Sequence, residues 1–163
     1  MQTLGAIAHA DYNAPGSYSY EEAAMCCFRL GLMMNDIEQL FRRMVFNIMA
    51  VNQDDHVKNI SFLMNRRGIW SLAPAYDVTF AWNPSNYWLS SHQMSVNGKR
   101  SEIGYDDIAA AGRAMDISAS RIDSICNEVR SAVNKWPEYA RAVNIREDTI
   151  QTIDNVMQQN CID

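Results

Sequence analysis

The strongest constraint on the fold is an apolar stripe between residues 37 and 49. Its members recur every three or four positions, and they are Ile37, Leu40, Phe41, Met44, Val45, Ile48 and Met49. This spacing is typical of one face of an α-helix that packs against a core. The chain must therefore bury one long helix, which we expect to begin at Asn35 or Asp36 and to end near Val51.

Two further local signals flank this stripe. Ser19 is followed three positions later by Glu22, a capping box that predicts a helix running from there to about Met33. After the stripe, the short apolar runs 60–64 and 69–73 are separated by a turn sequence that ends at Gly68. This arrangement predicts a β-hairpin.

The second half of the chain divides into a long loop and a helical region. Residues 79–100 show little periodicity, which predicts a long ordered loop of the kind that often serves function. Helical patterns follow at 105–115, 118–136 and 146–159, with Ser118 and Asn144 as expected caps and a turn expected at Pro137. We therefore expect one domain over residues 1–163, mainly α with a small β-hairpin.

Composition excludes several classes of function. The chain is 48% hydrophobic and 20% charged, with no apolar run long enough to cross a membrane and no signal-peptide pattern. The net charge is −5 with only three lysines, which argues against direct binding to nucleic acid. The histidines lie far apart, and the cysteines at 26, 27, 126 and 161 form no C-x-x-C pair. Neither a metal site of these residues nor a disulfide framework is indicated, and reduced thiols in a cytoplasm are expected.

A polar cluster lies between the predicted long helix and the hairpin. It consists of Asp54, Asp55, His56, Lys58 and Asn59, and Asp77 follows the hairpin. Protein kinases use a catalytic aspartate, an asparagine five residues later and a second aspartate beyond a short β segment. Asp54, Asn59 and Asp77 have this arrangement. The same residues are also compatible with a solvated loop that caps the hairpin.

Three separated motifs resemble a known family. The patterns N-x-D-x-H-x-K-N at 52–59, W-S-L-A-P-A-Y-D-V at 70–78 and M-S-V-N-G-K-R at 94–100 are similar to the C-terminal lobe of HipA-family serine/threonine kinases. These kinases are the toxins of bacterial toxin–antitoxin pairs. The stretch 11–21 and the Y-D-D-I start of the helix at 105 fit as well, so the resemblance covers nearly the whole chain. It implies a kinase-like C-terminal lobe in the bacterial cytoplasm.

The resemblance implies a role for each residue of the polar cluster. Asp54 would be the catalytic base, and Asn59 and Asp77 would bind Mg²⁺ for ATP. Asp77 stands where the aspartate of a D-F-G motif would stand, although "DVT" has neither the phenylalanine nor the glycine. His56 and Lys58 would contact phosphate or support the loop, and Lys58 could instead pair with Asp55. Asp55 is not a ligand in this register, so its replacement by asparagine is expected to matter little.

The chain lacks the residues that hold nucleotide phosphates in a kinase. No G-x-G motif or P-loop is present, and no lysine precedes Lys58. We therefore expect the phosphates to be held by an N-terminal kinase lobe that this chain does not include. A lobe without that neighbour should expose apolar surface around its first helix and the hairpin. The resemblance also implies a HipB-like antitoxin and a protein substrate as partners, with an aminoacyl-tRNA synthetase as a candidate target.

Two other functions remain open at the level of sequence. The chain could be a non-catalytic helical module that binds an antitoxin or a partner lobe. Small-molecule phosphotransferases of the aminoglycoside type share the Asp-to-Asn spacing of residues 54 and 59 and form a weaker alternative.

Overall fold

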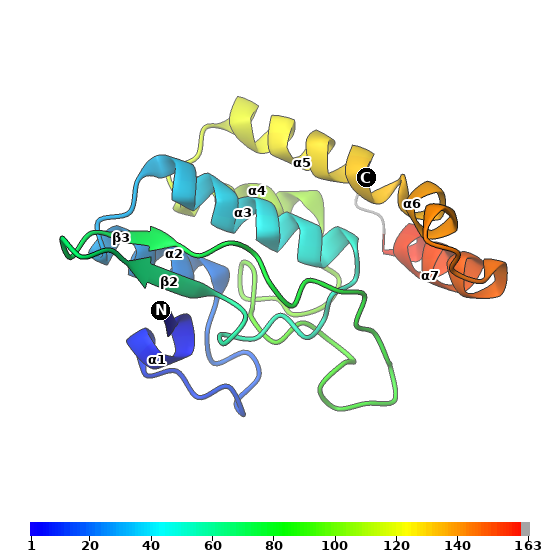
Figure 1. The fold of residues 1–163 in the computed structure, drawn as a ribbon, viewed down its shortest axis with the longest axis horizontal. Coiled ribbons are helices and arrows are strands. Elements are labelled where there is room, and N and C mark those ends of the chain that lie inside the picture. Colours follow the sequence, from blue (N-terminus) through cyan, green and yellow to red (C-terminus); the bar gives the residue numbers. More distant parts are fainter. Residues whose placement is uncertain (161–163) are drawn as a thin grey trace.

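The computed structural model describes residues 1–160, which form seven α-helices and one three-stranded antiparallel sheet (Figure 1). In chain order the elements are β1 Gln2–Thr3, α1 Leu4–Ala8, α2 Tyr20–Arg29, α3 Met34–Met49, β2 Ser61–Met64, β3 Trp70–Leu72, α4 Tyr105–Ala114, α5 Ala119–Val133, α6 Trp136–Ala142 and α7 Glu147–Gln159. The expectation of a mainly helical chain with a small β element is confirmed.

Helix α3 lies at the centre of the fold. It packs against α5, α2 and β3, and every member of its apolar stripe is buried. The N-cap of this helix is Met33, so the expectation that Asn35 or Asp36 caps it is wrong. Asp36 lies in its first turn instead, where Oδ1 accepts a hydrogen bond from the Leu72 amide at 3.4 Å. This bond ties the start of α3 to the end of the hairpin.

The predicted capping box and hairpin are both present. Ser19 Oγ accepts from the Glu22 amide at 3.1 Å, and Glu22 Oε2 accepts from the Ser19 amide at 2.8 Å. Strands β2 and β3 pair with Phe62 opposite Leu72, and Gly68 in the turn has φ 77°. Only glycine adopts this conformation without steric cost. The third strand, β1, pairs with β2 but has two residues, too few for any periodicity to reveal it.

In the C-terminal region, the expected turn at Pro137 and the expected cap at Asn144 are both wrong. Pro137 does not form a turn but lies in the first turn of α6, where a missing backbone N–H has no cost. Asn144 does not cap α7, because the N-cap is Arg146 and Asn144 has φ 61°. Ser118 is the N-cap of α5 as expected, although its side chain makes no capping hydrogen bond.

Two groups of buried side chains hold these elements together. The larger one joins α2, α3, the sheet, α4 and α5. The smaller one places Val156 and Met157 of α7 against Ala50 and Val51, directly before the polar cluster. Cys26, Cys27 and Cys126 are buried and free, whereas Cys161 lies outside the described residues. Over residues 1–160, the helices are too short or too polar to cross a membrane.

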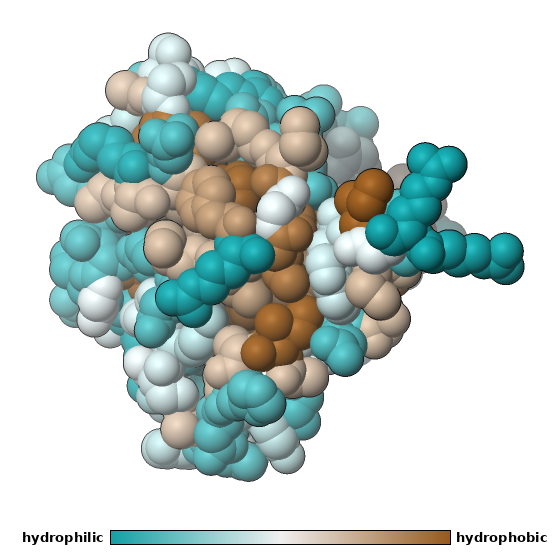
Figure 2. All heavy atoms as spheres, turned by 90° about the vertical axis from the view of Figure 1, so that its left-hand side faces the viewer, coloured by the Kyte–Doolittle hydropathy of each residue, from teal (hydrophilic) through white to brown (hydrophobic). Residues whose placement is uncertain are grey.

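Exposed hydrophobic side chains gather on the side of the molecule that lies at the left of Figure 1 (Figure 2). Met33 and Met64 project there, and the neighbouring turn residue Ile69 is also exposed. Their exposed fractions are 75%, 54% and 60%. We call Met33, Met64 and Ile69 the apolar face. Its position between α2 and the hairpin is the one expected from the sequence.

Candidate active site

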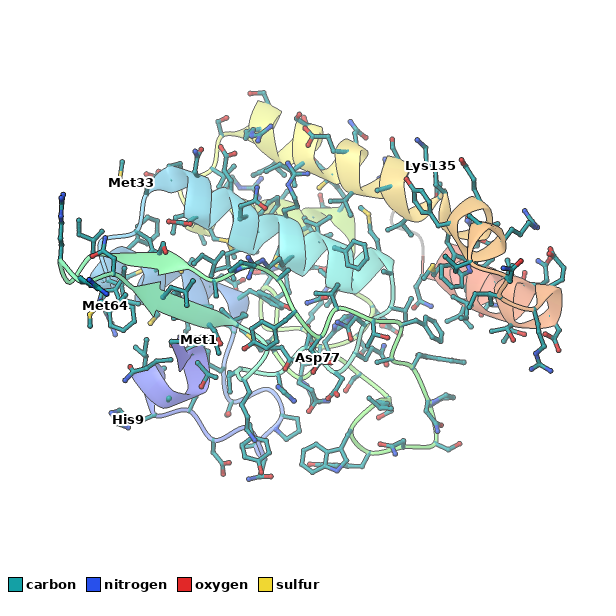
Figure 3. The ribbon with its side chains drawn as sticks, in the orientation of Figure 1. Met1, His9, Met33, Met64, Asp77 and Lys135 are labelled. Atoms are coloured by element: carbon teal, nitrogen blue, oxygen red, sulfur yellow. The ribbon has the colours of Figure 1, made fainter. Side chains whose placement is uncertain are left out.

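The polar cluster is held beside the segment that follows Asp77. Asn52 and Ala81 form a parallel bridge, in which the Gln53 amide donates to the Ala81 carbonyl at 2.9 Å and the Ala81 amide donates to the Val51 carbonyl at 3.1 Å. These bonds join the residues just before Asp54 to those just after Asp77. Figure 3 labels Asp77 where these loop segments converge beneath α3.

Asp77 has an unusual backbone conformation. Its φ of 53° lies in the left-handed region, which is uncommon for residues other than glycine but is adopted more readily by Asp and Asn. The preceding residue holds this segment in place. Ser61 Oγ lies 2.5 Å from the Tyr76 hydroxyl, which donates to the Lys58 carbonyl. Tyr76 therefore ties the segment of Asp77 to the polar cluster.

Asn59 and Asp77 line the same small cavity, of about 20 Å³. Asn59 Nδ2 donates to the Asp54 carbonyl at 2.9 Å, which directs Oδ1 away from that bond. The cavity is large enough for a water-sized occupant. An amide oxygen and a carboxylate are ligands that Mg²⁺ accepts, so these two residues fit a magnesium site. Within the described chain, no three side chains of His, Cys, Asp or Glu are grouped to hold a metal ion.

The Asp54 carboxyl is partly exposed, at 44% of its side chain. Partial burial raises its pKa above the ordinary value, and the negative charges of Asp77 and Asp55 raise it further. His56, whose Nε2 lies 3.9 Å from Asp54 Oδ1, opposes this effect. A reachable carboxylate of this kind can accept a proton from a substrate hydroxyl.

Tyr12, from the 11–21 stretch, contacts His56 and Lys58 of the polar cluster. Its ring meets the His56 ring edge-on at a centroid distance of 6.3 Å, and Lys58 Nζ lies 3.0 Å from the Tyr12 centroid. The second contact is a cation–π interaction. Lys58 therefore contacts Tyr12 rather than Asp55, and phosphate contact or loop support by His56 and Lys58 stays a prediction.

Sequence reasoning missed the importance of Asp55. Its side chain is buried, at 2% exposure, and accepts hydrogen bonds from the Tyr20 hydroxyl at 2.9 Å and the Gln93 amide at 2.7 Å. His92 Nδ1 lies 3.0 Å from its carboxylate. The alternative in which Asp55 belongs to a solvated loop is therefore wrong, whereas the small effect of Asp55→Asn on phosphate transfer stays a prediction. No local pattern could reveal this, because these partners lie 35 or more positions away.

The network around Asp55 continues into α3. Asn47 Nδ2 donates to the Tyr20 hydroxyl at 2.9 Å, and Asn52 Nδ2 donates to Asn47 Oδ1 at 3.0 Å. Burial and the nearby Asp55 carboxylate raise the pKa of Tyr20 well above its ordinary value, so its hydroxyl remains a donor. This network fixes the polar cluster against two helices.

The M-S-V-N-G-K-R motif has a structural role. Asp107 in the first turn of α4 accepts from Lys99 Nζ at 2.8 Å, Asn97 Nδ2 at 2.9 Å and the Gly104 amide at 3.0 Å. The hydrogen bond from Lys99, followed by those from Asn97 and Gly104, lowers the pKa of Asp107 to about 2. These bonds anchor the end of the long loop on α4.

Comparison with known proteins adds one finding. A protein-family model described as the HipA-like C-terminal domain matches residues 1–136. The matched range contains Asp54, Asn59, Asp77 and the whole network around Asp55. A search of curated proteins found no match.

Proposed function

Because the chain belongs to the family of HipA-like C-terminal domains, we propose that it is the catalytic lobe of a HipA-like serine/threonine protein kinase toxin. The reaction would transfer phosphate from ATP with Mg²⁺ to a hydroxyl of a protein. One observation carries the proposal. Asn59 and Asp77 line the same cavity, and Asn59 Nδ2 donates a hydrogen bond to the Asp54 carbonyl at 2.9 Å.

In this proposal each residue of the set has one task. The Asp54 carboxylate orients the substrate hydroxyl and receives its proton as the oxygen–phosphorus bond forms. Asn59 Oδ1 and the Asp77 carboxylate hold Mg²⁺. When bound, the ion neutralises charge on the phosphates of ATP.

Rigid support for these groups is the second part of the proposal. Phosphoryl transfer depends on positioning and electrostatics more than on covalent chemistry by the protein. Asn59 holds the Asp54 backbone, Tyr76 holds the segment of Asp77, and Asp55 is anchored to α2 through Tyr20. These bonds limit the movement of the base and of both proposed ligands.

We propose that the phosphates of ATP are held by an N-terminal kinase lobe. The chain has no glycine-rich phosphate loop, and its first lysine, Lys58, contacts Tyr12. The apolar face of Met33, Met64 and Ile69 supplies surface that such a lobe could cover. The antitoxin and an aminoacyl-tRNA synthetase target implied by the resemblance are further proposed partners.

The exposed apolar face also favours a second candidate function. A non-catalytic module would use this surface to bind an antitoxin or a partner lobe without transferring phosphate. Such a module would need neither a catalytic base nor metal ligands. Measuring phosphate transfer by variants of Asp54 and Asp77 therefore separates the kinase from the non-catalytic module.

Phosphate transfer from labelled ATP tests the proposal. The chain should be assayed alone and joined to an N-terminal kinase lobe, with Asp54→Asn, Asp77→Asn and the exposed control Asp106→Asn. We expect transfer only with both lobes and a loss on the order of 10³-fold for the two site variants. Undiminished transfer by Asp54→Asn would exclude it as the base. Robust transfer by the chain alone would contradict the need for a second lobe.

A further inference from the structure

Helix α3 ends in a Schellman motif whose left-handed position is occupied by valine. The Asn52 amide donates to the Asn47 carbonyl at 2.8 Å, and the Val51 amide donates to the Ile48 carbonyl at 3.3 Å. This pair of bonds defines the motif, which requires a left-handed residue directly after the helix cap, here Ala50. Val51 is that residue, with φ 54°.

Valine is an unfavourable residue for this conformation. Glycine is the usual residue at this position, because it has no Cβ to meet the following carbonyl oxygen. Other residues are disfavoured in the left-handed region by about five- to thirtyfold, and β-branched residues are genuine outliers there. Among residues 1–160, Val51 is the one β-branched residue with a positive φ. Its tertiary surroundings must therefore stabilise this conformation.

Helix α7 packs against Val51. The Val51 side chain is 1% exposed and belongs to the smaller of the two buried groups. Apart from Ala50, the other buried members of this group in the described chain are Val156 and Met157 of α7. Phe80, from the long loop, packs against the same group. In Figure 1, α6 and α7 stand at one end of the molecule, next to the end of α3.

A cavity of about 560 Å³ borders the same contact. Val51 and Gln53 line it from the segment just before the polar cluster, and residues 159–160 line it from the end of α7. The long loop contributes Trp82 and Glu102 to its wall. The end of α7 and the start of the polar segment are therefore neighbours at two places, the buried group and this cavity.

The conformation of Val51 sets the direction in which the chain enters the polar cluster. The Val51 carbonyl accepts from the Ala81 amide at 3.1 Å, and the Gln53 amide donates to the Ala81 carbonyl at 2.9 Å. Asp54 follows directly. A change of φ at Val51 would redirect its carbonyl and the amides that follow, so it would break these bonds and displace Asp54.

We propose that α7 positions Asp54 through Val51. The packing of Val156 and Met157 holds Val51 in its left-handed conformation, and this conformation fixes the segment that carries the proposed base. Helix α7 lies outside the range matched by the family model, which ends at residue 136. The consequence for phosphate transfer rests on the proposed kinase function, whereas the coupling between α7 and the loop does not.

Amide hydrogen exchange tests the coupling without catalysis. The amides of Asn52, Gln53 and Ala81 report on the loop, since each donates one of the bonds that depend on Val51. Met157→Ala should speed their exchange about tenfold, because the left-handed conformation loses its support. In the Val51→Gly background, the same change should have less than about a twofold effect, because glycine needs no support there.

Two further variants complete the test. Gln158→Ala changes an exposed neighbour of Met157 on α7 and should leave the three amides unaffected. Val156→Ala removes less volume than Met157→Ala and should give the same pattern with a smaller effect. Amides in the middle of α5 serve as the reference for any global loss of stability. Unchanged exchange in both Met157→Ala and Val156→Ala would overturn the proposal, and so would equal acceleration with valine and with glycine at position 51.

A kinetic arm separates this inference from the proposed function. In the two-lobed protein, Met157→Ala should lower kcat about tenfold with little change in KM, and the addition of Val51→Gly should restore kcat. Coupled exchange in a protein that transfers no phosphate would refute the kinase proposal alone. Faster exchange in Met157→Ala with an unchanged kcat would refute the positioning of Asp54 by α7.

Discussion

Asp54 and Asp55 are neighbours in the chain but lie in opposite environments. The Asp54 carboxyl is partly exposed, whereas Asp55 is buried and bound by groups from α2 and from the 92–93 segment. One carboxyl is accessible to solvent, and the other holds the loop in place. This division follows from burial and hydrogen bonding, not from residue type.

The pKa of Asp54 tests the proximity of Asp77. Asp77→Asn removes a negative neighbour and should lower the pKa of Asp54, because the ionised form is then repelled less. His56→Gln should raise it, because an attractive partner is lost. Carbon-13 NMR titration of the Asp54 carboxyl measures both changes. No change in Asp77→Asn would show that the two side chains do not interact.

Asp55→Asn should destabilise the fold. The amide that replaces one carboxylate oxygen cannot accept from the donors that now surround it, so the free energy of unfolding should fall by about 1–3 kcal/mol. Urea denaturation measures this loss. The exposed control Asp106→Asn should change stability by a few tenths of a kcal/mol. Equal stability of the two variants would contradict the role assigned to the buried network.

At the scale of elements, the long loop is held at both ends. The bridge between Asn52 and Ala81 fixes its beginning beside the polar cluster, and Asp107 fixes its end on α4. Between them, Ser95 pairs with Ser19 at the start of α2. A loop anchored in this way can line a cavity with a defined shape, as Trp82 and Glu102 do.

Asp107→Asn should give a pH-dependent loss of stability. The folded-state pKa of Asp107 is about 2, below the ordinary 3.8, so its ionised form stabilises the fold above pH 4. This contribution disappears as the pH falls from about 4 to about 2. The difference in unfolding free energy between wild type and variant should therefore be constant near neutrality and narrow in this window. Urea denaturation at several pH values measures it, with Asp106→Asn as the neighbouring control.

For the molecule as a whole, exposed apolar side chains near the hairpin are the feature that bears on partners. Met33 and Met64 project from one side of the molecule (Figure 3), and Ile69, in the hairpin turn beside Met64, is exposed as well. The candidate active site lies elsewhere, where the loop segments converge at Asp77.

The apolar face should make the isolated chain self-associate at high concentration. The double variant Met64→Lys and Ile69→Lys places charges on the hairpin and should shift the chain toward monomer. Sedimentation velocity over a range of concentrations measures this. Tyr139→Lys on α6, which is 54% exposed, should not have this effect. A wild-type chain that stays monomeric at all concentrations would argue against an exposed docking surface.

The sequence by itself determined the local elements: the buried stripe of α3, the capping box of α2, the hairpin and the loop after it. Each has a periodicity or a turn signal within a few residues. It also singled out Asp54, Asn59 and Asp77 by spacing, and their roles remain predictions. Only the tertiary structure decided the environment of Asp55 and the cavity beside Gln53. Both depend on contacts between segments far apart in the chain, and a local pattern carries no information about such contacts.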